Sequence, residues 1–255
     1  MAARLSGTIR WLSTPEQIVI LAAGLGSRLT GVEGSLPKPL VEVAGLPLIA
    51  HALAHAEASG CREAVIVIGH QRGRVRQVVE GLQTSLGIRF VEAEDPSAPN
   101  GHSLLAAAPL AQSCFYLQMV DHVFTQPVLP LLGRSRLRDD EAGRLLVDLS
   151  PDVALDLEDA TRVRLDGARI VSIGKGLPAW DAVDTGCFLL TERVFDALRE
   201  VPAGESRTVS SGMRRLVEKG ALWAVSIGEI AWADVDTPAD LAAAQQALAV
   251  GSYRG

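Results

Sequence analysis

Hydrophobic positions in the first half of the chain form short continuous runs, separated by segments that mix apolar and polar residues. Runs of this length are too short for helices and are typical of strands buried on both faces of a sheet. The predicted strands are residues 18–21, 64–69, 87–92 and 115–122. Helices are predicted between them, from Pro47 to Ser59 and over 71–84. This alternation predicts an α/β fold with a doubly wound, mostly parallel sheet.

The pattern changes after Arg144, where short strands follow one another with hairpin signals between them. These predicted strands are residues 145–149, 161–165, 169–173 and 182–190. Asp166-Gly167 between two of them is a strong turn signal. A closing helix is predicted over 238–249, with Thr237 as its N-cap. The second half is therefore expected to be a hairpin-rich lobe.

The segment after the first strand carries candidate phosphate-binding residues. They are Leu21, Ala22, Ala23, Gly24, Gly26 and Ser27. Small residues let several backbone amides face one ligand, and glycine tolerates the positive φ that such a turn requires. Arg28 and Lys38 add two spaced cations, and Lys38 stands between two prolines on what we expect to be an exposed loop. Amides and cations together predict a nucleoside triphosphate site. An ordinary strand-to-helix glycine turn is the alternative.

Two better-known phosphate motifs do not fit this segment. The dinucleotide fingerprint requires a glycine where the chain has Leu29, and the P-loop requires a lysine directly after its last glycine.

Three aspartates are candidate metal ligands. Asp121 ends a predicted strand at the sheet edge where the glycine segment lies, and ligands of open α/β sheets bind at that edge. Asp234 and Asp236 lie two residues apart, so both side chains face one side of an extended segment. Because carboxylate oxygens suit Mg²⁺, we predict a magnesium site with Asp121 and Asp236 as main ligands and Asp234 in support. Capping or helix-start roles are the alternatives.

A second group of residues is predicted to bind the acceptor substrate. Lys175 follows a predicted strand and is placed to meet a phosphate, and Asp184 and Thr185 offer hydrogen-bonding groups for hydroxyls. A surface lysine and a capping Asp-Thr pair are the alternative.

The predicted reaction is attack by a phosphate-monoester oxygen on the α-phosphorus of the nucleotide, with pyrophosphate leaving in line. The attacking oxygen is already anionic at neutral pH, so the site must supply positioning and charge neutralisation rather than a general base. Arg28 and Lys38 are expected to hold the β- and γ-phosphates. With Lys175, they form the predicted catalytic set.

The run from Leu21 to Arg28, with Pro37-Lys38-Pro39, resembles the signature of nucleotidyltransferases that join a nucleoside triphosphate to a phosphorylated sugar or alcohol. Four other segments look like one branch of this superfamily, the CTP:inositol-1-phosphate cytidylyltransferases. They are residues 100–103, 119–122, 171–177 and 182–188. The resemblance implies a Rossmann-like sheet of the GT-A type. It also implies Mg²⁺-dependent formation of CDP-inositol and pyrophosphate from CTP and inositol 1-phosphate.

The resemblance adds three nucleotide-binding candidates, and the chain differs from the family's usual pattern at one position. Asn100, Gly101 and Ser103 match the place where the family reads the base and ribose. A turn and N-cap before a helix over 104–110 is the alternative, and it is compatible with binding. Val120 departs from the small residue that many relatives have before the aspartate.

The resemblance also sets the expected organisation. Residues 1–15 are expected to be an N-terminal extension, and 16–255 a single nucleotidyltransferase domain. Within it, residues 16–125 form the nucleotide-binding half and 126–255 the acceptor-binding half. In this branch the enzyme is often fused to a membrane phosphotransferase that makes di-inositol phosphate phosphodiesters. We expect a free-standing version here, whose product passes to a separate membrane enzyme.

Composition restricts the kinds of partner and the compartment that we expect. A net charge of −6 argues against a nucleic-acid surface. The cysteines Cys61, Cys114 and Cys187 are isolated, which indicates a reducing, cytoplasmic location. No run approaches the ~20 apolar residues that would span a membrane. The sequence is compatible with a monomer and with a homodimer.

Other acceptor substrates and other classes of protein are also compatible with the sequence. Phosphocholine or a sugar 1-phosphate is the nearest alternative acceptor. A choline pocket requires an aromatic cage, and the chain is only 4% aromatic, which favours a polyol. A non-catalytic nucleotide-binding subunit and a glycosyltransferase with an Asp-X-Asp metal motif are the alternative classes.

Overall fold

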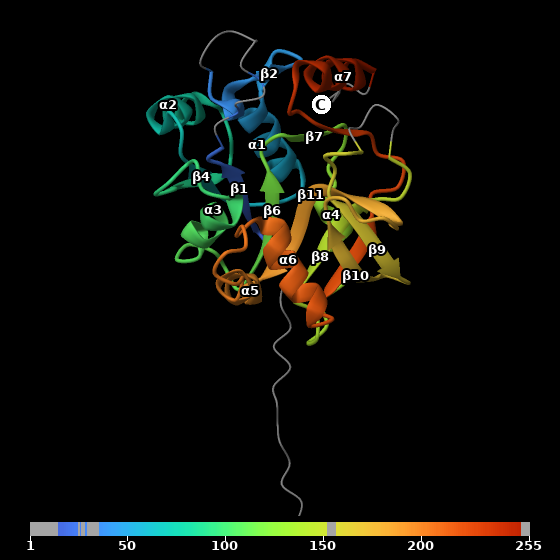
Figure 1. Cartoon of the computed structure of the whole chain (residues 1–255). Coiled ribbons are helices and arrows are strands. Elements are labelled where there is room, and N and C mark those ends of the chain that lie inside the picture. The colour runs from blue at the N-terminus through green and yellow to red at the C-terminus, as the bar shows by residue number, and fades with distance from the viewer. Residues whose placement is uncertain (1–14, 25, 27–28, 30–35, 152–156, 251–255) are drawn as a thin grey trace, which may run out of the picture.

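The computed structural model describes residues 15–24, 26, 29, 36–151 and 157–250. Nine strands in this part of the chain form one sheet (Figure 1). They are β1 (Gln17–Ala22), β4 (Glu63–Ile68), β5 (Gly87–Glu92), β6 (Cys114–Met119), β8 (Gly143–Asp148), β9 (Arg162–Asp166), β10 (Arg169–Gly174), β11 (Ala182–Thr191) and β12 (Leu222–Ser226). Their order across the sheet is β5-β4-β1-β6-β11-β8-β12-β10-β9.

Helices cover both faces of this sheet, and two short strand pairs stand apart from it (Figure 1). The α-helices of the described residues are α1 (Leu48–Ala58), α2 (Arg72–Gly81), α3 (Asn100–Ala107), α4 (Leu129–Leu132), α5 (Arg193–Arg199), α6 (Val209–Glu218) and α7 (Pro238–Val250). The strand pairs are β2 (Glu42–Val43) with β3 (Leu46–Pro47), and β7 (His122–Phe124) with β13 (Trp232–Asp234). A 3₁₀ turn, η2 (Lys38–Leu40), precedes β2.

Strand β1 lies inside the sheet and separates two hydrophobic cores. Ile18 and Ile20 face the core that contains apolar residues of α1, α2, α4 and α7. Val19 and Leu21 face the other core, which contains apolar residues of α3, α5 and α6. Alternating side chains of a strand point to opposite faces, so a strand covered by helices on both sides must be apolar throughout. This arrangement explains the continuous hydrophobic run from which the strand was predicted.

The α/β class is confirmed, but the prediction of a mostly parallel sheet is wrong. Strands β5, β4, β1 and β6 are parallel, as expected from the strand–helix alternation. Strand β11 is antiparallel to both of its neighbours β6 and β8, and β10 is antiparallel to β12 and β9. Only β12 pairs in parallel with β8 in the second half. Short connections such as the Asp166–Arg169 turn can join only antiparallel neighbours, so a hairpin-rich half produces a mixed sheet.

Two predicted element boundaries also differ from the structure. The strand predicted over 115–122 ends at Met119, and the chain turns at Asp121 before β7 begins. Strand β7 leaves the main sheet and pairs with β13. Helix α3 begins at Asn100 rather than at residue 104, with Pro99 at its N-cap. Both shifts place polar side chains differently from the sequence-based expectation.

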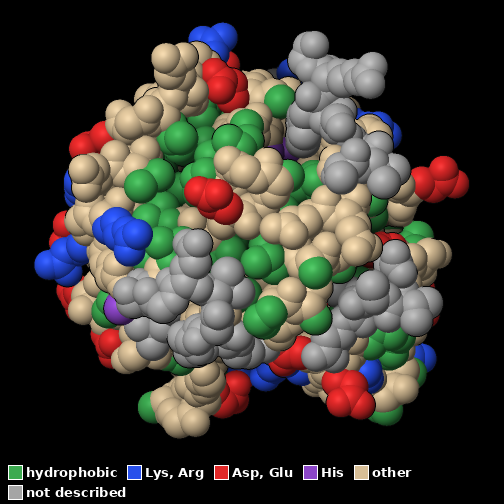
Figure 2. Space-filling view, turned by 90° about the horizontal axis from the view of Figure 1, so that it is seen from above, with side chains coloured by type: hydrophobic (Ala, Val, Ile, Leu, Met, Phe, Trp, Pro, Cys, Tyr) green, Lys and Arg blue, Asp and Glu red, His purple; other side chains and the backbone are tan. Residues whose placement is uncertain are grey.

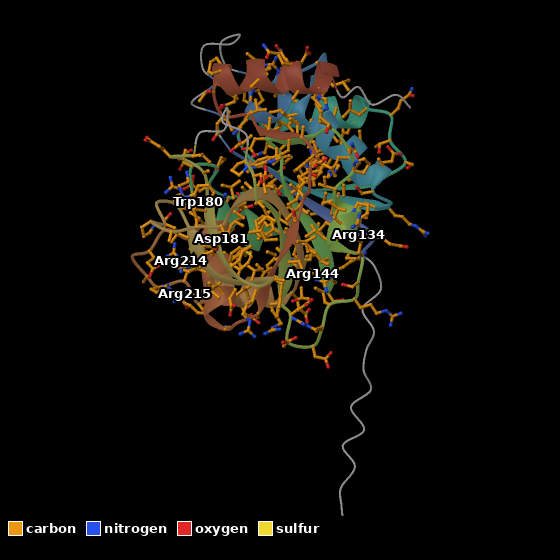
Figure 3. The ribbon with its side chains drawn as sticks, turned by 90° about the vertical axis from the view of Figure 1, so that its right-hand side faces the viewer. Arg134, Arg144, Trp180, Asp181, Arg214 and Arg215 are labelled. Carbon is orange, nitrogen blue, oxygen red and sulfur yellow. The ribbon has the colours of Figure 1, made fainter. Side chains whose placement is uncertain are left out.

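Arg144 holds the segment between α4 and β8. Its guanidinium group donates to the Glu141 carboxylate, with a distance of 2.7 Å from Nη2 to Oε2. It also donates to the carbonyl oxygens of Leu132, Ser135 and Arg136. Figure 3 shows Arg144 on the lower part of the sheet. Because the buried charge is paired and its donors are satisfied, a segment without regular structure packs firmly there.

The end of the molecule that carries α7 is partly apolar. Figure 2 looks down on this end and shows hydrophobic side chains gathered on the face, with charged side chains mostly toward its rim. Leu241, Ala244 and Leu248 of α7 contribute to the core beneath. Among the described helices, none has the length and apolar character needed to cross a membrane.

Candidate active site

The carboxyl ends of β1 and β6 open into a cavity of about 320 Å³. Its lining includes most of the predicted nucleotide-binding residues: Leu21, Ala23, Gly24, Gly26, Asn100 and Ser103. Lys38, Asp121 and Asp236 line the same cavity. The structure therefore gathers the glycine segment, one predicted cation and two predicted metal ligands in one place.

Among the described residues predicted for the glycine segment, Ala22 is not in this lining. Ala22 faces the hydrophobic core on the opposite side of β1. Ser27 and Arg28 lie outside the described residues. Their predicted roles stay predictions.

Gly26 is required by both its backbone and its surroundings. Its φ is +64°, in the left-handed region that glycine tolerates best. A Cβ atom at this position would lie 2.8 Å from the Cβ of Lys38. The absence of a side chain thus lets the loop approach Lys38 closely.

Lys38 lies in the interior of the site, so the prediction of an exposed loop is wrong. Its side chain is only 10% exposed. The Nζ atom donates to Oδ2 of Asp121 at 2.6 Å and to Oδ1 of Asp236. Prolines on either side restrict the backbone of η2 and hold the lysine in this position.

The two aspartates reach Lys38 from distant parts of the chain. The amide of Val235 donates to the carbonyl oxygen of Asp121 at 3.0 Å, which extends the β7–β13 ladder to the turn that carries Asp121. Asp236 follows this ladder, and its own amide donates to the Asp240 carboxylate. The predicted N-cap is confirmed, because the Asp240 amide donates to Oγ1 of Thr237. The ladder and the helix start together fix where Asp236 points.

Lys38 and Asp121 stabilise each other in their charged forms. Burial opposes ionisation of Asp121, but the charge of Lys38 and the hydrogen bond from His122 outweigh it and lower the pKa of Asp121. Burial likewise opposes the charge on Lys38, whereas Asp121, Asp236 and Asp234 raise the pKa of Lys38 above its usual value. At neutral pH the site therefore contains a charged lysine beside the ionised carboxylate of Asp121.

His122 lies directly behind Asp121. Its Nδ1 atom is 2.8 Å from Oδ1 of Asp121, and its Nε2 atom is 3.9 Å from Oδ2 of Asp234. Burial opposes protonation, but the two carboxylates outweigh it and raise the pKa of His122 to about 9. The imidazole is therefore protonated at neutral pH and donates to Asp121.

The donor set fits a hard divalent cation. Carboxylate oxygens of Asp121 and Asp234 lie within 4.8 Å of one another, beside the imidazole of His122. Oδ1 of Asp234 is buried and has no hydrogen-bond partner within the described part of the chain. Burial raises the pKa of Asp234 to about 7, because a buried carboxylate without a donor is costly unless a proton or a cation neutralises it. Carboxylates are ligands that Mg²⁺ prefers, so Asp121, Asp234 and Asp236 are suitable to hold this ion.

A second cavity of about 1010 Å³ adjoins the first one. Asn100, Met119, Asp121 and Asp236 line both cavities, so the carboxylates stand where the two spaces meet. This position suits a reaction between a ligand in each cavity, since the reacting groups would meet at the carboxylates.

The second cavity contains two of the three predicted acceptor-binding residues, Lys175 and Asp184. Lys175 pairs with Asp159 and its side chain is 57% exposed. Asp184 accepts a hydrogen bond from the amide of Gly186 at 2.7 Å, and burial raises the pKa of Asp184 to about 6. Arg214 of α6, labelled in Figure 3, adds a cation that the sequence-based prediction missed. No local motif marks it.

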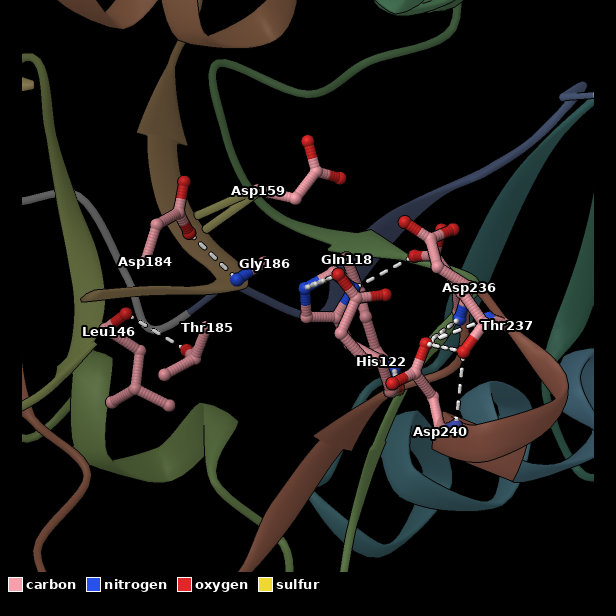
Figure 4. A network of polar contacts seen from close by, with 12 residues as sticks. Gln118, His122, Leu146, Asp159, Asp184, Thr185, Gly186, Asp236, Thr237 and Asp240 are labelled. Carbon is pink, nitrogen blue, oxygen red and sulfur yellow. Dashed lines mark hydrogen bonds and ion pairs between the residues drawn. The ribbon is translucent and has the colours of Figure 1, made fainter. Parts of the chain in front are cut away.

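Thr185 does not reach this cavity. Its side chain is fully buried, and the hydroxyl donates to the carbonyl oxygen of Leu146 at 2.8 Å. Figure 4 shows Thr185 turned toward Leu146, away from His122 and Asp236. Because neighbouring residues of a strand point to opposite faces, Asp184 and Thr185 could not both face one ligand. We therefore leave Thr185 out of the acceptor site.

Two residues of α3 have structural contacts of their own. Oδ1 of Asn100 accepts from the amide of Val209, the first residue of α6, at 2.8 Å. A Cβ atom on Gly101 would lie 2.4 Å from the carbonyl oxygen of Arg207. Gly101 lines neither cavity, so its position is explained by the close packing of α3 against the start of α6.

An α/β sheet with a cavity of about 320 Å³ at the strand ends, a buried lysine and convergent carboxylates defines a nucleotidyltransferase site. The chain belongs to the MobA-like NTP transferase family, whose domain model matches residues 18–148. This match confirms the superfamily resemblance.

Longer alignments to individual proteins agree with this family. A "Bifunctional IPC transferase and DIPP synthase" of Rubrobacter xylanophilus is 38% identical over 224 residues, which are 87% of this chain and 49% of that protein. The "CMP-5'-(3-aminopropyl)phosphonate synthase" of Streptomyces rubellomurinus is 33% identical over 246 residues, covering 89% of this chain and 38% of that protein. The chain thus spans about half the length, or less, of these relatives.

The fold is shared with a solved structure, the inositol-1-phosphate CTP transferase from T. maritima. The TM-score is 0.83 at 24% identity, and the superposition covers 95% of this chain and 98% of that one. The likeness therefore extends over both halves of the sheet, and it is a likeness of fold.

Proposed function

We propose that this chain transfers a cytidylyl group from CTP to inositol 1-phosphate, giving CDP-inositol and pyrophosphate. The observation that carries the proposal is the meeting of Lys38, Asp121 and Asp236 at the junction of two cavities. The smaller cavity would take the nucleotide and the larger one the acceptor. The transfer would occur between them.

The choice of substrates draws support from the relatives. The Rubrobacter protein is named an IPC transferase, and the Streptomyces protein is named for a CMP-linked product. The fold neighbour is named for inositol 1-phosphate and CTP. A cytidine nucleotide is common to two of these names, which favours CTP over other nucleotides.

Nucleotide binding would begin at the glycine segment. Gly24 has nothing within 4 Å of the place where a Cβ would stand, so its backbone is open to phosphate oxygens. An ammonium group has three donors, and Asp121 and Asp236 receive two of those of Lys38. The third donor would hold a phosphate oxygen. Arg28, which follows the glycine segment in the sequence, is proposed to join it at the β- and γ-phosphates.

The carboxylates are proposed to hold Mg²⁺, with Asp121 and Asp236 as main ligands and Asp234 in support. When bound, this ion supplies positive charge that neutralises the phosphate oxygens of the two substrates. Asn100 and Ser103 would border the nucleotide and position it. The acceptor phosphate enters as an anion, so no residue has to act as a general base.

Acceptor recognition is proposed for the larger cavity. Asp184 would accept hydrogen bonds from polyol hydroxyls, and Lys175 would meet the acceptor phosphate. The product would then be available to a separate membrane phosphotransferase. The three cysteines are buried and free, which agrees with action in a reducing compartment such as the cytoplasm.

A second acceptor class is favoured by one observation. The Streptomyces relative is named for an aminopropyl phosphonate product. The larger cavity carries carboxylates of Asp159, Asp184 and Asp234, which would suit an acceptor with an ammonium group. An aminoalkyl phosphonate or phosphocholine is therefore the alternative acceptor.

A pyrophosphate-release assay separates these cases. The assay combines each of four nucleoside triphosphates with inositol 1-phosphate, phosphocholine, 3-aminopropylphosphonate or glucose 1-phosphate. We expect the highest kcat/KM for CTP with inositol 1-phosphate, loss of activity in EDTA, and recovery on addition of MgCl₂. A higher kcat/KM for any other pair would overturn the proposed substrates. Release of no pyrophosphate from any pair would favour a non-catalytic nucleotide-binding protein.

A further inference from the structure

The Asp121 carboxylate is held from two sides by different residues. Its Oδ2 atom accepts from Nζ of Lys38 at 2.6 Å, and its Oδ1 atom accepts from Nδ1 of His122 at 2.8 Å. A carboxylate with one donor on each oxygen has a fixed plane as well as a fixed position. Loss of the His122 donor would leave the carboxylate free to rotate about Cβ–Cγ, because only one oxygen would still be held.

The imidazole itself packs against Trp232 and against the backbone at Gly186. The Trp232 ring stacks on His122 with a centroid distance of 5.7 Å and an interplanar angle of 7°. Gly186 lies against the imidazole, and a Cβ atom there would be 2.7 Å from the ring. The φ of Gly186 is +71°, so glycine is favoured by conformation as well as by space. Strands β11 and β13 together therefore fix the plane of the imidazole.

The backbone of His122 is held by a chain of buried polar groups. Nε2 of Gln118 donates to the carbonyl oxygen of His122 at 3.2 Å. Nδ1 of His55 is 2.8 Å from Oε1 of Gln118, and the Val128 amide donates to Nε2 of His55 at 2.9 Å. Because Nε2 accepts, the His55 proton must be on Nδ1, where it donates to Gln118. Each group has a defined partner, so the carbonyl of His122 is anchored from α1.

Other roles for His122 are disfavoured by these contacts. Its Nδ1 atom is committed to Asp121, and its Nε2 atom is directed toward Asp234 rather than into open space. The proposed reaction needs no general base, since the attacking phosphate oxygen is anionic.

We propose that His122 is a positioning residue, which uses its Nδ1–H to turn Asp121 toward Lys38 and the metal site, and that Trp232 and Gly186 form the slot that aims it. Residues that orient a metal-binding carboxylate typically change metal affinity or activity by roughly 10- to 100-fold. The inference rests on the proposed metal site, but not on the identity of the acceptor.

Replacing His122 with asparagine or with glutamine tests the roles of its two ring nitrogens separately. The side-chain nitrogen of asparagine occupies nearly the place of Nδ1, whereas that of glutamine reaches the place of Nε2. His122→Asn therefore keeps the donor to Asp121, and His122→Gln loses it. Thr125→Val is the matched control, because Thr125 also lies next to β7 and its hydroxyl donates to the carbonyl of Ala231, outside both cavities.

The primary measurement is Mn²⁺ binding to the acceptor-free protein, followed by electron paramagnetic resonance of the free ion. We expect the Mn²⁺ Kd of His122→Gln to rise by roughly 10- to 100-fold, and those of His122→Asn and Thr125→Val to stay within about threefold of the wild type. In pyrophosphate release, His122→Gln should lower kcat with little change in the KM for CTP.

Equal Mn²⁺ affinity in His122→Gln and the wild type would overturn the proposal. So would an equal loss in the glutamine and asparagine variants, because the Nδ1 donor would then not be the cause, and so would a wild-type protein that binds no Mn²⁺. Should His122→Gln fail to fold, His122→Ser takes its place in the comparison. A wild-type protein that binds Mn²⁺ but ignores inositol 1-phosphate would refute the proposed acceptor and leave the His122 inference standing.

Discussion

Lys38 has its two partners 83 and 198 residues away in the sequence. The local Pro-Lys-Pro sequence is typical of an exposed turn, yet Lys38 is buried where distant elements bring Asp121 and Asp236 to it. A chemistry-bearing residue could thus be identified from the sequence, whereas its environment could not. This burial changes the expected effect of a substitution from a purely catalytic loss to a loss of stability as well.

Replacing Lys38 with methionine should destabilise the protein by about 3–5 kcal/mol. Methionine keeps much of the side-chain volume but leaves two carboxylates, 17% and 24% exposed, without their cation, and breaking a largely buried pair on one side has a cost of this size. Urea unfolding in EDTA would measure the difference. Lys219→Met is the matched control, since Lys219 pairs with Glu200 on an exposed surface and should change stability by less than about 1 kcal/mol. Equal stability of the two variants would contradict the role of Lys38.

The pH dependence of stability should also differ between Lys38→Met and the wild type. In the wild type the pKa of Asp121 lies below its unfolded value of about 3.9, so ionised Asp121 stabilises the fold above that pH and the contribution is lost as pH falls further. Without Lys38, burial raises the pKa of the carboxylates, and the folded state then binds more protons than the unfolded state. Unfolding between pH 7 and 4 should show the variant gaining stability relative to the wild type as pH falls. A constant difference would argue against buried, unpaired carboxylates.

Helix α3 illustrates how packing between elements overrides a local pattern. Pro-Asn-Gly-His is typical of a turn, yet the helix already begins at Asn100, with no side-chain cap. The Asn100 side chain instead accepts from the first amide of α6, and Gly101 packs against the backbone at Arg207. The two helices therefore meet at their N-terminal ends, next to both cavities. No signal within residues 99–103 reports this contact.

Gly101→Ala and Gly73→Ala should have opposite effects on stability. Each glycine is the second residue of its helix, α3 or α2. A Cβ on Gly73 meets nothing within 4 Å, so alanine should stabilise by about 0.5–1 kcal/mol through its helix propensity. A Cβ on Gly101 would collide with the Arg207 carbonyl, and alanine should destabilise by about 1–3 kcal/mol. Thermal unfolding of both variants measures the contrast, and stabilisation by Gly101→Ala would refute the proposed packing.

For the whole molecule, the sequence predicts the nucleotide half better than the acceptor half. Strands β1 and β4 are apolar on both faces and, with β5, alternate with helices, so the parallel order of the three follows from local patterns and right-handed connection. The insertion of antiparallel β11 between β6 and β8 depends on packing between distant segments. Likewise, Asp121 and Asp236 could be predicted to meet because carboxylates are suited to share one Mg²⁺ ion, whereas Arg214 has no sequence signal.

Asp121 lines both cavities and stands where they meet, so the proposed transfer between the cavities depends on this residue. The most direct test is pyrophosphate release from CTP and inositol 1-phosphate by Asp121→Asn. Asparagine keeps the size of the side chain but removes its charge, and we expect kcat/KM to fall by roughly 100- to 1000-fold, as for other lost electrostatic groups in active sites. Full activity of this variant, folded and assayed with Mg²⁺, would contradict the site.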